Sequence, residues 1–521
     1  MAKKIIINGR DLSIEDLYNL TKDPQIKVEV SPTVFVTIKK SRKFLEDALG
    51  KKVIYGVNTG FGPMASYIID SRDLISLQEN LIRSHAVGMG DPIPEEYVLA
   101  AMVVRLNTLV KGFSGVSPEL IKHLEIFINN RIIPIIPEHG AVGTSGDLVQ
   151  LAHIALALIG EGEAIYQGQR KPVSKILKSL DIKPYQLKAK EGLALINGTS
   201  MMSAVAALVC FNVNKLLNLS IRAGAFALEL VHGFDDSISE NLHKLRPHKG
   251  QVHIARLMRK ILRSSRLLRS RDEFQDSVEI PKEVKEISQI VQEVYSFRCI
   301  PQILGPVFDI FDKVKNEVQI EINSVTDNPI IDWENEQFLH GGNFHGDYIA
   351  AGVDQLKIGL AKLTLLSERR INFFLNKKVN IHLPPFLNLH TPGLTLGLQG
   401  LQFVATSTTA QNQTLAFPHS VHSIPTNGDN QDVVSMGTDA ALFAAKVVEN
   451  LYIVLAIELI TLAQAIDVFK TQDKLSESSK ELFHGIREIF PVIINDRLLT
   501  NQLAEVVSFM KTNFYFNLEH R

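Results

Sequence analysis

The chain has 521 residues, of which 45% are hydrophobic and 21% charged, and its formal net charge at pH 7 is -1. This length and apolar content exclude a disordered protein and allow about two to four domains with large buried cores. A near-neutral chain has no charge-driven affinity for nucleic acid or for a membrane surface, so we expect neither partner. The two cysteines can build neither a disulfide framework nor a metal cluster, and their scarcity is typical of a cytoplasmic protein.

Neither of two apolar stretches has the features of a targeting or membrane segment. Residues 1–12 contain too short an apolar run for a signal peptide. The most apolar segment, 451–462, is interrupted by Glu458 and is shorter than the about 20 residues that a membrane span needs. We therefore expect a cytoplasmic protein in which 451–462 is a buried helix of a bundle.

Two helix starts near the N-terminus are predicted from a serine followed by a proline. Serine caps the first backbone N–H groups of a helix, and proline is tolerated in its first turn. The pair at 31–32 predicts a helix that ends near Gly50, and the pair at 117–118 opens a second helix.

Helical patterns dominate the rest of the chain. Beyond Thr199 the sequence is almost entirely long helical pattern, to about Thr471, and strand-like alternation is confined to 27–30 and 163–167. The predicted fold class is therefore mainly α, with a long central helical bundle and a smaller N-terminal domain. The expected division is an N-terminal domain at 1–197, a central bundle at 198–480 and a C-terminal helical segment at 481–521.

A basic stretch lies between residues 254 and 271. Apolar residues recur in it at helical spacing, so we interpret it as an amphipathic helix with a solvated basic face, not as a nucleic-acid site. The apolar positions are Ile254, Leu257, Met258, Ile261 and Leu268, and the basic ones are Arg256, Arg259, Lys260, Arg263, Arg266, Arg269 and Arg271.

The segment 143–148, GTSGDL, places a serine between small residues, directly before an apolar helix that we expect over 147–160. Such a segment can cyclise, because Gly146 lacks a Cβ and its nitrogen can approach the Thr144 carbonyl closely. Loss of water and of the Ser145 hydroxyl would leave a methylidene electrophile, which no standard side chain supplies. Taken alone, the same residues also fit a simple helix cap.

Two loops carry polar aromatic residues. The segment 55–62, YGVNTGFG, lacks the glycine spacing of nucleotide-binding loops, so we expect no nucleotide there but a mobile loop that presents Tyr55. Tyr295 and Arg298 end a helical stretch, and arginine is the natural partner of a substrate carboxylate. The sixteen histidines show no metal-binding spacing, so we assign no metal.

Several motifs follow one another in order between about residues 50 and 470. They are YGVNTGFG at 55–62, GTSGDLVQLAH at 143–153, INGTS at 196–200, YSFRC at 295–299, NPI at 328–330, GGNFHG at 341–346 and NQDVVSMG at 430–437. Together they resemble the aromatic amino acid ammonia-lyase family, whose members are histidine, phenylalanine and tyrosine ammonia-lyases and related aminomutases.

The resemblance implies a helical-bundle architecture related to that of fumarase-like enzymes. It also implies a methylidene-imidazolone formed from Thr144, Ser145 and Gly146, with no metal and no nucleotide. Family members are typically homotetramers whose active sites combine residues from several subunits, so we expect the same here. The products would be ammonia and a trans-α,β-unsaturated acid, and either the substrate amine or its aromatic ring could engage the electrophile.

Further matches imply residue roles. Tyr55 matches the base that removes the β-proton, which requires a phenol pKa below the ordinary value of about 10. Tyr295 matches a second essential tyrosine, and Arg298 matches the clamp on the substrate carboxylate. The remaining matches are Asn197 and Gln292, which hydrogen-bond the ring or the substrate, and Asn328 and Phe344, which surround the electrophile.

The sequence departs from the family pattern at the centre of the site. The family usually has Ala-Ser-Gly, and Thr144 replaces the alanine. This residue contributes only its carbonyl carbon to the ring, so we expect the electrophile to form, while the cyclisation rate and the hydrogen bonding of the ring stay open.

Two positions bear on the substrate. Ser84 and His85 lie where phenylalanine enzymes usually have Phe-Leu, and His85 can hydrogen-bond a phenol or an imidazole. Gln431 lies where histidine enzymes usually carry glutamate. Together these positions favour L-tyrosine, deaminated to trans-4-coumarate, and the chain is particularly similar to bacterial tyrosine ammonia-lyases. The alternatives are a histidine ammonia-lyase that forms urocanate, then a phenylalanine ammonia-lyase or a 2,3-aminomutase, and, outside the family, an inactive helical scaffold.

Overall fold

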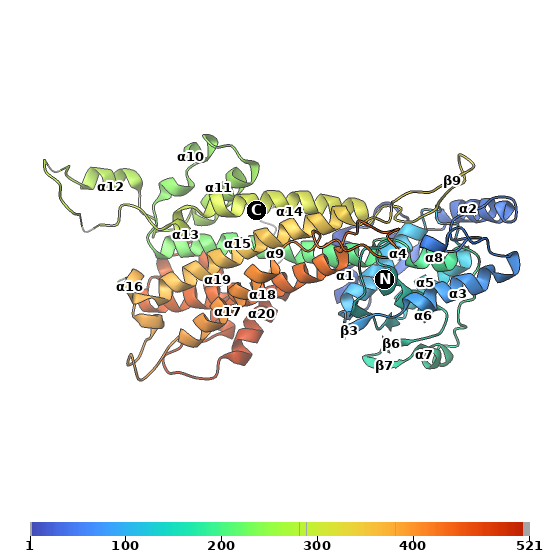
Figure 1. Ribbon diagram of the computed structural model, residues 1–521. Coiled ribbons are helices and arrows are strands. Elements are labelled where there is room, and N and C mark those ends of the chain that lie inside the picture. Colours follow the sequence, from blue (N-terminus) through green and yellow to red (C-terminus); the bar gives the residue numbers. More distant parts are fainter. Residues whose placement is uncertain (1–2, 281, 288, 381, 514–521) are drawn as a thin grey trace. The chain divides into compact units, whose positions relative to one another are not determined.

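The computed structural model describes residues 3–280, 282–287, 289–380 and 382–513 (Figure 1). The fold class is mainly α, as predicted. Residues 1–2 of the N-terminal stretch and residues 514–521 of the expected C-terminal segment lie outside the described residues.

The chain forms two compact units whose segments interleave along the sequence. The first unit comprises Met1–Phe211, Lys313–Asp354 and Pro418–Ala445, and the second comprises Asn212–Asp312, Gln355–Phe417 and Lys446–Arg521. They therefore differ from the three consecutive segments expected from the sequence, because long helices that return to the same unit leave no local boundary signal.

The first unit carries short helices and small sheets. Its helices are α1 (Ile14–Lys22), α2 (Val34–Ala48), α3 (Leu74–His85), α4 (Glu95–Leu109), α5 (Pro118–Asn129), α6 (Leu148–Leu158), α7 (Val173–Ser179) and α8 (Glu191–Ile196). Residues Tyr97 to Leu109 of α4 are all buried, as expected of a helix that is apolar on nearly every side.

The sheets of this unit are small. β1 (Lys4–Ile7) pairs in parallel with β2 (Lys27–Val30). Antiparallel pairs join β3 (Met89–Pro92) to β5 (Pro137–His139), and β8 (Ile330–Asp332) to β9 (Gln337–Leu339). A third sheet has the order β4 (Ile133–Pro134), β6 (Glu163–Tyr166), β7 (Gln169–Pro172). The strands predicted at 27–30 and 163–167 are thus confirmed.

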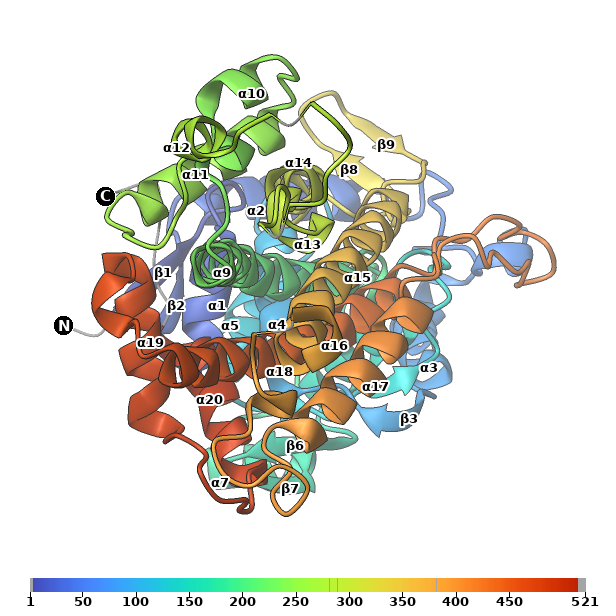
Figure 2. The same cartoon turned by 90° about the vertical axis from the view of Figure 1, so that its left-hand side faces the viewer.

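Four long helices have residues in both units: α9 (Ser200–Leu230), α14 (Ile300–Glu321), α15 (Asp347–Leu375) and α18 (Gly437–Phe469). The other helices of the second unit are α10 (Glu240–Lys244), α11 (Lys249–Leu262), α12 (Arg271–Ser277), α13 (Tyr295–Arg298), α16 (Lys377–Asn380), α17 (Gln399–Leu415), α19 (Glu477–Ile489) and α20 (Thr500–Asn513). Figure 2 shows α9 and α14 nearly end-on.

Two helices, α9 and α18, are long and apolar enough to cross a membrane by length and composition alone. Of their most apolar windows, however, 78% and 83% respectively are buried inside the protein, as in the core helices of a bundle. The segment 451–462 lies within α18, so the prediction of a buried helix there is confirmed.

The predicted helix starts show which local signals acted as expected. Ser117 caps α5, because its hydroxyl accepts a hydrogen bond from the Leu120 N–H at 3.4 Å. The helix α2 begins at Val34, after the predicted 31–32 pair. The helix α6 begins at Leu148, but the side chain of Asp147 does not cap it.

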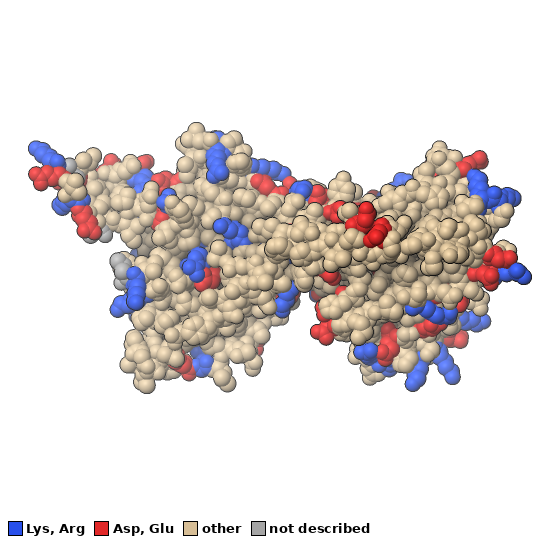
Figure 3. All heavy atoms as spheres, viewed as in Figure 1, with Lys and Arg blue, Asp and Glu red and all other residues tan. Residues whose placement is uncertain are grey.

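The basic stretch at 254–271 is a helix only in its first part. α11 ends at Leu262, with its apolar face buried as predicted, and Leu268 lies beyond it. The arginines that follow bind neighbouring acceptors: Arg266 donates to the Asp473 carbonyl (2.7 Å), Arg269 to Glu293 (3.1 Å) and Arg271 to Asp236 (2.8 Å). On the face drawn in Figure 3, Lys and Arg are interspersed with Asp and Glu.

Candidate active site

The turn at Ser145 has an unusual backbone. Ser145 and Gly146 adopt positive φ angles of 51° and 82°. The Ser145 carbonyl accepts a hydrogen bond from the Gly198 N–H at 3.1 Å, and the Asp147 N–H donates to the Gly198 carbonyl at 2.8 Å. A Cβ at position 146 would lie 2.1 Å from the Gly198 oxygen, so only glycine fits there.

Asp147 connects this turn to the starts of two further helices. Its carboxylate accepts hydrogen bonds from the N–H groups of Met201 (2.7 Å) and Met202 (3.0 Å), at the start of α9. It also accepts a hydrogen bond from the hydroxyl of Thr438, at the start of α18. The helix-cap interpretation was thus right about the residue type and wrong about the helix, since Asp147 caps α9 instead of α6.

The first turns of α6, α9 and α18 therefore meet at the Ser145 turn. The positive ends of helix dipoles and the free N–H groups of first turns favour negative charge nearby. We therefore expect the helix dipoles to favour electron density that arrives at the Ser145 turn, although the α9 N–H groups of Met201 and Met202 are already bound by Asp147.

Burial raises the pKa of Asp147 to about 6. Because the native pKa then exceeds that of the unfolded chain, the folded protein holds an extra proton between about pH 4 and 6 and loses stability as pH rises through that window. In Asp147→Asn this titration is absent. We expect the melting temperature of the wild type to fall relative to that of the variant from pH 4 to 6 and to run parallel above pH 6, measured by thermal denaturation. A relative increase across pH 4 to 6 would contradict the assignment.

A cavity of about 450 Å³ in the first unit contains the Ser145 turn. Six of the predicted site residues line it: Tyr55, Thr144, Ser145, Asn328, Phe344 and Gln431. Segments far apart in the sequence thus meet where the electrophile would form, and the scattered motifs are brought together by the fold.

Tyr55 is held in this cavity by contacts of its own loop. Its hydroxyl accepts a hydrogen bond from the Gly62 N–H at 3.0 Å, and its ring meets that of Phe61 edge to face, with centroids 6.4 Å apart. The Tyr55 N–H donates to Nε2 of His340 at 3.4 Å. The phenol therefore lines the same cavity as Ser145, as a base for that site requires.

Asn197 lies one residue before Gly198, and a buried ion pair fixes its amide. Its Nδ2 donates to Asp327 Oδ1 (2.9 Å) and to the Asn328 carbonyl (2.8 Å), and Lys190 binds the other oxygen of Asp327 at 2.7 Å. Both members of the ion pair are fully buried. Since the two partners of Nδ2 can only accept, the Asn197 carbonyl oxygen is turned away from them.

Other predicted residues lie outside the cavity lining. Ser84 and His85 end α3, and their side chains hydrogen-bond the Leu81 carbonyl at 3.0 and 2.9 Å. Gln292, Tyr295 and Arg298 belong to the second unit, and none of the three lines the Ser145 cavity.

Within the second unit, Arg298 and Tyr295 contact each other. The Arg298 guanidinium lies 4.6 Å from the Tyr295 ring centroid, and its Nε donates to the Glu293 carbonyl at 2.8 Å. Gln292 lines a separate cavity of about 550 Å³ in that unit, together with Phe297 and Phe373.

Sequence reasoning missed several residues of the site. His340, His345 and Asp432 also line the Ser145 cavity, and His345 Nε2 lies 3.2 Å from the Val433 carbonyl oxygen. Each of these residues sits in or beside a quoted motif, so proximity to the motifs was the signal that could have found them. The same signal marks Asp327, which directly precedes the motif at 328–330, but none marks Lys190.

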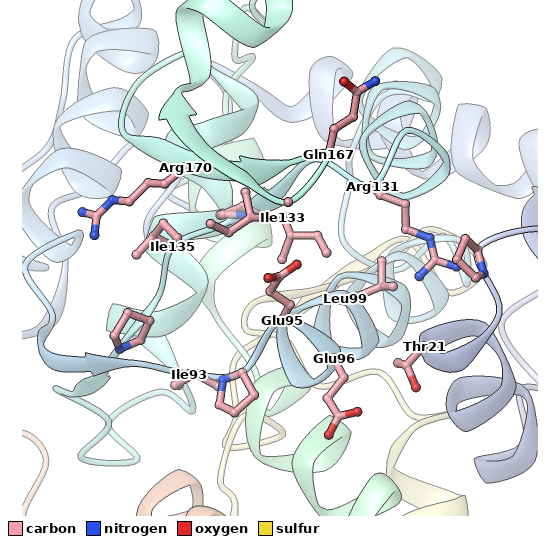
Figure 4. Close-up of a pocket in the computed structure, with 16 residues that line it drawn as sticks. Thr21, Ile93, Glu95, Glu96, Leu99, Arg131, Ile133, Ile135, Gln167 and Arg170 are labelled. Carbon is pink, nitrogen blue, oxygen red and sulfur yellow. The ribbon is translucent and has the colours of Figure 1, made fainter. Parts of the chain in front are cut away.

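The first unit also holds a larger cavity, of about 780 Å³, shown in Figure 4. Figure 4 shows Ile133 and Ile135 among its apolar lining residues. Three of its four charged residues are engaged elsewhere: Glu96 binds Lys22, Arg170 binds Glu163, and Arg131 donates to the Leu20 carbonyl. None of the predicted site residues lines this cavity, so size alone does not identify the active site.

The Ser145 turn fits the methylidene-imidazolone that the resemblance implies. The tight turn between Gly143 and Gly146, the absence of a side chain at Gly146 and the Gly198 N–H on the Ser145 carbonyl are what the cyclised group requires. Thr144, Ser145 and Gly146 would form the group, which supplies an electrophile. Among the described residues, no group of three or more His, Cys, Asp or Glu side chains could hold a metal ion.

Comparison with known proteins identifies the class. Residues 12–488 match the family described as aromatic amino acid lyase. The chain is 40% identical to histidine ammonia-lyase of Macrococcus caseolyticus over 514 residues, which cover 98% of this chain and 99% of the relative.

Two solved structures share the fold. Tyrosine aminomutase from Streptomyces globisporus has a TM-score of 0.93 and 36% identity, covering 97% of this chain and 96% of that one. Histidine ammonia-lyase from Trypanosoma cruzi has a TM-score of 0.88 and 31% identity, covering 98% and 93%. The family match and the histidine ammonia-lyase relatives show that the chain is a carbon–nitrogen lyase. The chain belongs to the aromatic amino acid lyase family.

Proposed function

We propose that this chain eliminates ammonia from an aromatic L-amino acid whose side chain can hydrogen-bond, with L-histidine as the first candidate and L-tyrosine as the second. The observation that carries the proposal is the shared cavity of Tyr55 and the Ser145 turn. A candidate base and the segment that would form an electrophile line one cavity, as elimination of a poor leaving group requires.

The comparisons favour histidine over our sequence-based choice of tyrosine. Relatives with 38–41% identity over nearly the whole chain are histidine ammonia-lyases. The choice of tyrosine depended on Gln431 and His85, and His85 does not line the Ser145 cavity.

One observation keeps tyrosine as the second candidate. Gln431 lines the Ser145 cavity and is uncharged, whereas the family resemblance associates a glutamate at this position with histidine. A neutral amide can hydrogen-bond a phenol without the charge that suits an imidazole.

The chain's own residues would act as follows. Tyr55, held by the Gly62 N–H, would take the β-proton of the bound substrate onto its phenolate oxygen. The first turns of α6, α9 and α18 would stabilise electron density at the Ser145 turn. Phe344 would contact the aromatic ring of the substrate, and Asn328 would contribute a polar wall.

We further propose a cytoplasmic homotetramer with shared active sites. Tyr295, Arg298 and Gln292 match functional positions of the family but do not line the Ser145 cavity. A site completed by these residues from another subunit would reconcile their predicted roles with that placement. Analytical ultracentrifugation, and rescue of Ser145→Ala by mixing with Arg298→Ala in one tetramer, would test this arrangement.

The experiment that tests the function is a direct comparison of substrates. Purified protein is incubated separately with L-histidine, L-tyrosine and L-phenylalanine, and the ultraviolet absorbance of the unsaturated acid is followed. Dominance of histidine supports the first candidate, and dominance of tyrosine supports the second. Formation of a β-amino acid, detected by chiral chromatography, would instead support a 2,3-aminomutase.

The family resemblance, and not the cavity lining, assigns His85 to substrate recognition, and it predicts that His85→Phe shifts substrate preference toward L-phenylalanine. The substitution removes the hydrogen-bonding ring from the end of α3, and a site that loses such a group stops discriminating against an analogue without its partner. We expect the ratio of kcat/KM for phenylalanine over the preferred substrate to rise by about 10- to 100-fold. An unchanged ratio would remove His85 from the specificity site.

A further inference from the structure

Gln78 lies in α3 and is completely buried. Its amide spans two backbone groups that belong to different parts of the site. Nε2 donates to the carbonyl of Gly56 at 3.1 Å, and Oε1 accepts from the N–H of Leu193 at 2.9 Å. Gly56 directly follows Tyr55, and Leu193 lies in the helix that leads to Asn197.

The bond to Leu193 completes the first turn of α8. The N–H groups of a first helical turn have no partner within the helix, and the residue before α8, Lys190, provides no side-chain cap. Gln78 supplies the missing acceptor from another helix. Every residue of α8 is buried, so the Leu193 N–H that Gln78 binds lies in the core.

The bond to Gly56 holds the loop that presents Tyr55. A Cβ at Gly56 would lie 2.6 Å from Leu193 Cδ2, and a Cβ at Gly192 would lie 2.7 Å from the Gln78 carbonyl oxygen. The backbone of the loop therefore packs closely on the Leu193 side chain, and the backbone of α8 packs closely on that of α3. Outside the adjoining residues 52–69, the loop also hydrogen-bonds His340, but this bond from the Tyr55 N–H is longer, at 3.4 Å, and His340 is exposed.

We propose that Gln78 is a positioning residue for Tyr55: its amide ties the loop 55–62 to α8 and so sets where the phenol lies relative to the Ser145 turn. This inference rests on the proposed function of Tyr55 as the base. A displacement of about 1 Å in a reacting group can lower a rate about 100-fold. Loss of the two hydrogen bonds of this one buried amide can therefore lower the rate of proton removal by Tyr55.

Gln78→Met keeps the length of the side chain and removes both bonds. With whichever amino acid the wild type turns over, we expect kcat per ring-containing subunit to fall about 10- to 100-fold and KM to stay within about threefold. The ring content, measured by intact mass as the loss of two waters, should be unchanged. The primary isotope effect with substrate deuterated at the β-carbon should increase, because proton removal becomes slower.

Gln464→Met is the matched control. Gln464 is also fully buried and also bridges backbone groups, donating to the Ile493 carbonyl at 2.8 Å and accepting from the Ile493 N–H at 3.2 Å. It lies in the second unit and should lose stability while keeping kcat and the isotope effect of the wild type. An equal loss of kcat in both variants would overturn the proposal.

Gln78→Glu tests the Gly56 bond separately if the methionine variant does not fold. It keeps an acceptor for the Leu193 N–H and lacks a donor for the Gly56 carbonyl once its carboxyl is ionised, so kcat should again fall at a pH above the pKa of that carboxyl. A wild-type kcat per ring in this variant would overturn the proposal.

Hydrogen exchange separates this inference from the proposed function. Amide exchange over residues 55–62 should be faster in Gln78→Met and unchanged in Gln464→Met, whether or not any amino acid is turned over. Unchanged exchange in Gln78→Met would overturn the proposal even if the enzyme is active. If exchange is faster in Gln78→Met but the wild type turns over none of the amino acids tested, only the proposed function is contradicted.

Discussion

Ser145→Ala should lower kcat by at least about 1000-fold, the largest effect that we expect from a single substitution. The Ser145 hydroxyl is the group whose loss would create the methylidene, so alanine removes the source of the electrophile while the turn persists. Alanine keeps a side chain at φ 51°, as serine does, and the Gly198 bonds involve only the backbone. The fold should therefore survive.

Two measurements check this expectation together. Intact mass should show the wild type lower than its sequence by two waters and Ser145→Ala at its full sequence mass. Ser179→Ala, at an exposed position at the end of α7, is the control and should show both the wild-type mass loss and wild-type turnover. Turnover by Ser145→Ala within about tenfold of the wild type would exclude the electrophile as the basis of activity.

Tyr55→Phe should lower kcat by about 100- to 10,000-fold, as expected for the loss of a general base. The substitution removes only the hydroxyl that accepts the Gly62 N–H bond, and the edge-to-face contact with Phe61 can remain. Because Tyr55 is not part of the cyclising segment, the loss of two waters should still occur. The variant thus separates proton removal from formation of the electrophile.

Tyr67→Phe is the control for this variant. Tyr67 is 66% exposed and lies shortly after the same loop, and it does not line the Ser145 cavity. It should retain wild-type kinetics with every substrate. If Tyr55→Phe turned over as fast as Tyr67→Phe, another group would have to be the base.

Thr144 remains the point at which this chain differs from the usual family pattern. Its side chain is partly buried at the lining of the Ser145 cavity. A β-branched residue there narrows the backbone conformations open to the turn before cyclisation. No structural contact explains why threonine replaces alanine.

Local signals in the sequence were sufficient for the fold class and several helix ends. Apolar periodicity and the serine cap at 117 act over a few residues, and α5 begins as predicted. The strands at 27–30 and 163–167 also follow from local alternation. The prediction of one helix over the basic stretch 254–271 was wrong for its second half, where carboxylates from other segments bind Arg269 and Arg271.

The sequence by itself determined the chemistry that is available: a cyclisable Thr144-Ser145-Gly146 and a tyrosine on a glycine-rich loop. Only the tertiary structure decided which groups share a cavity with the turn and which helix each polar side chain serves. Asp147 caps α9 and not α6, and Gln78 joins the Tyr55 loop to α8. The residue type determines whether a side chain can donate or accept a hydrogen bond. Its partner, however, is a backbone group 54 residues away for Asp147 and 115 residues away for Gln78. Only the folding of the chain brings such distant groups within reach.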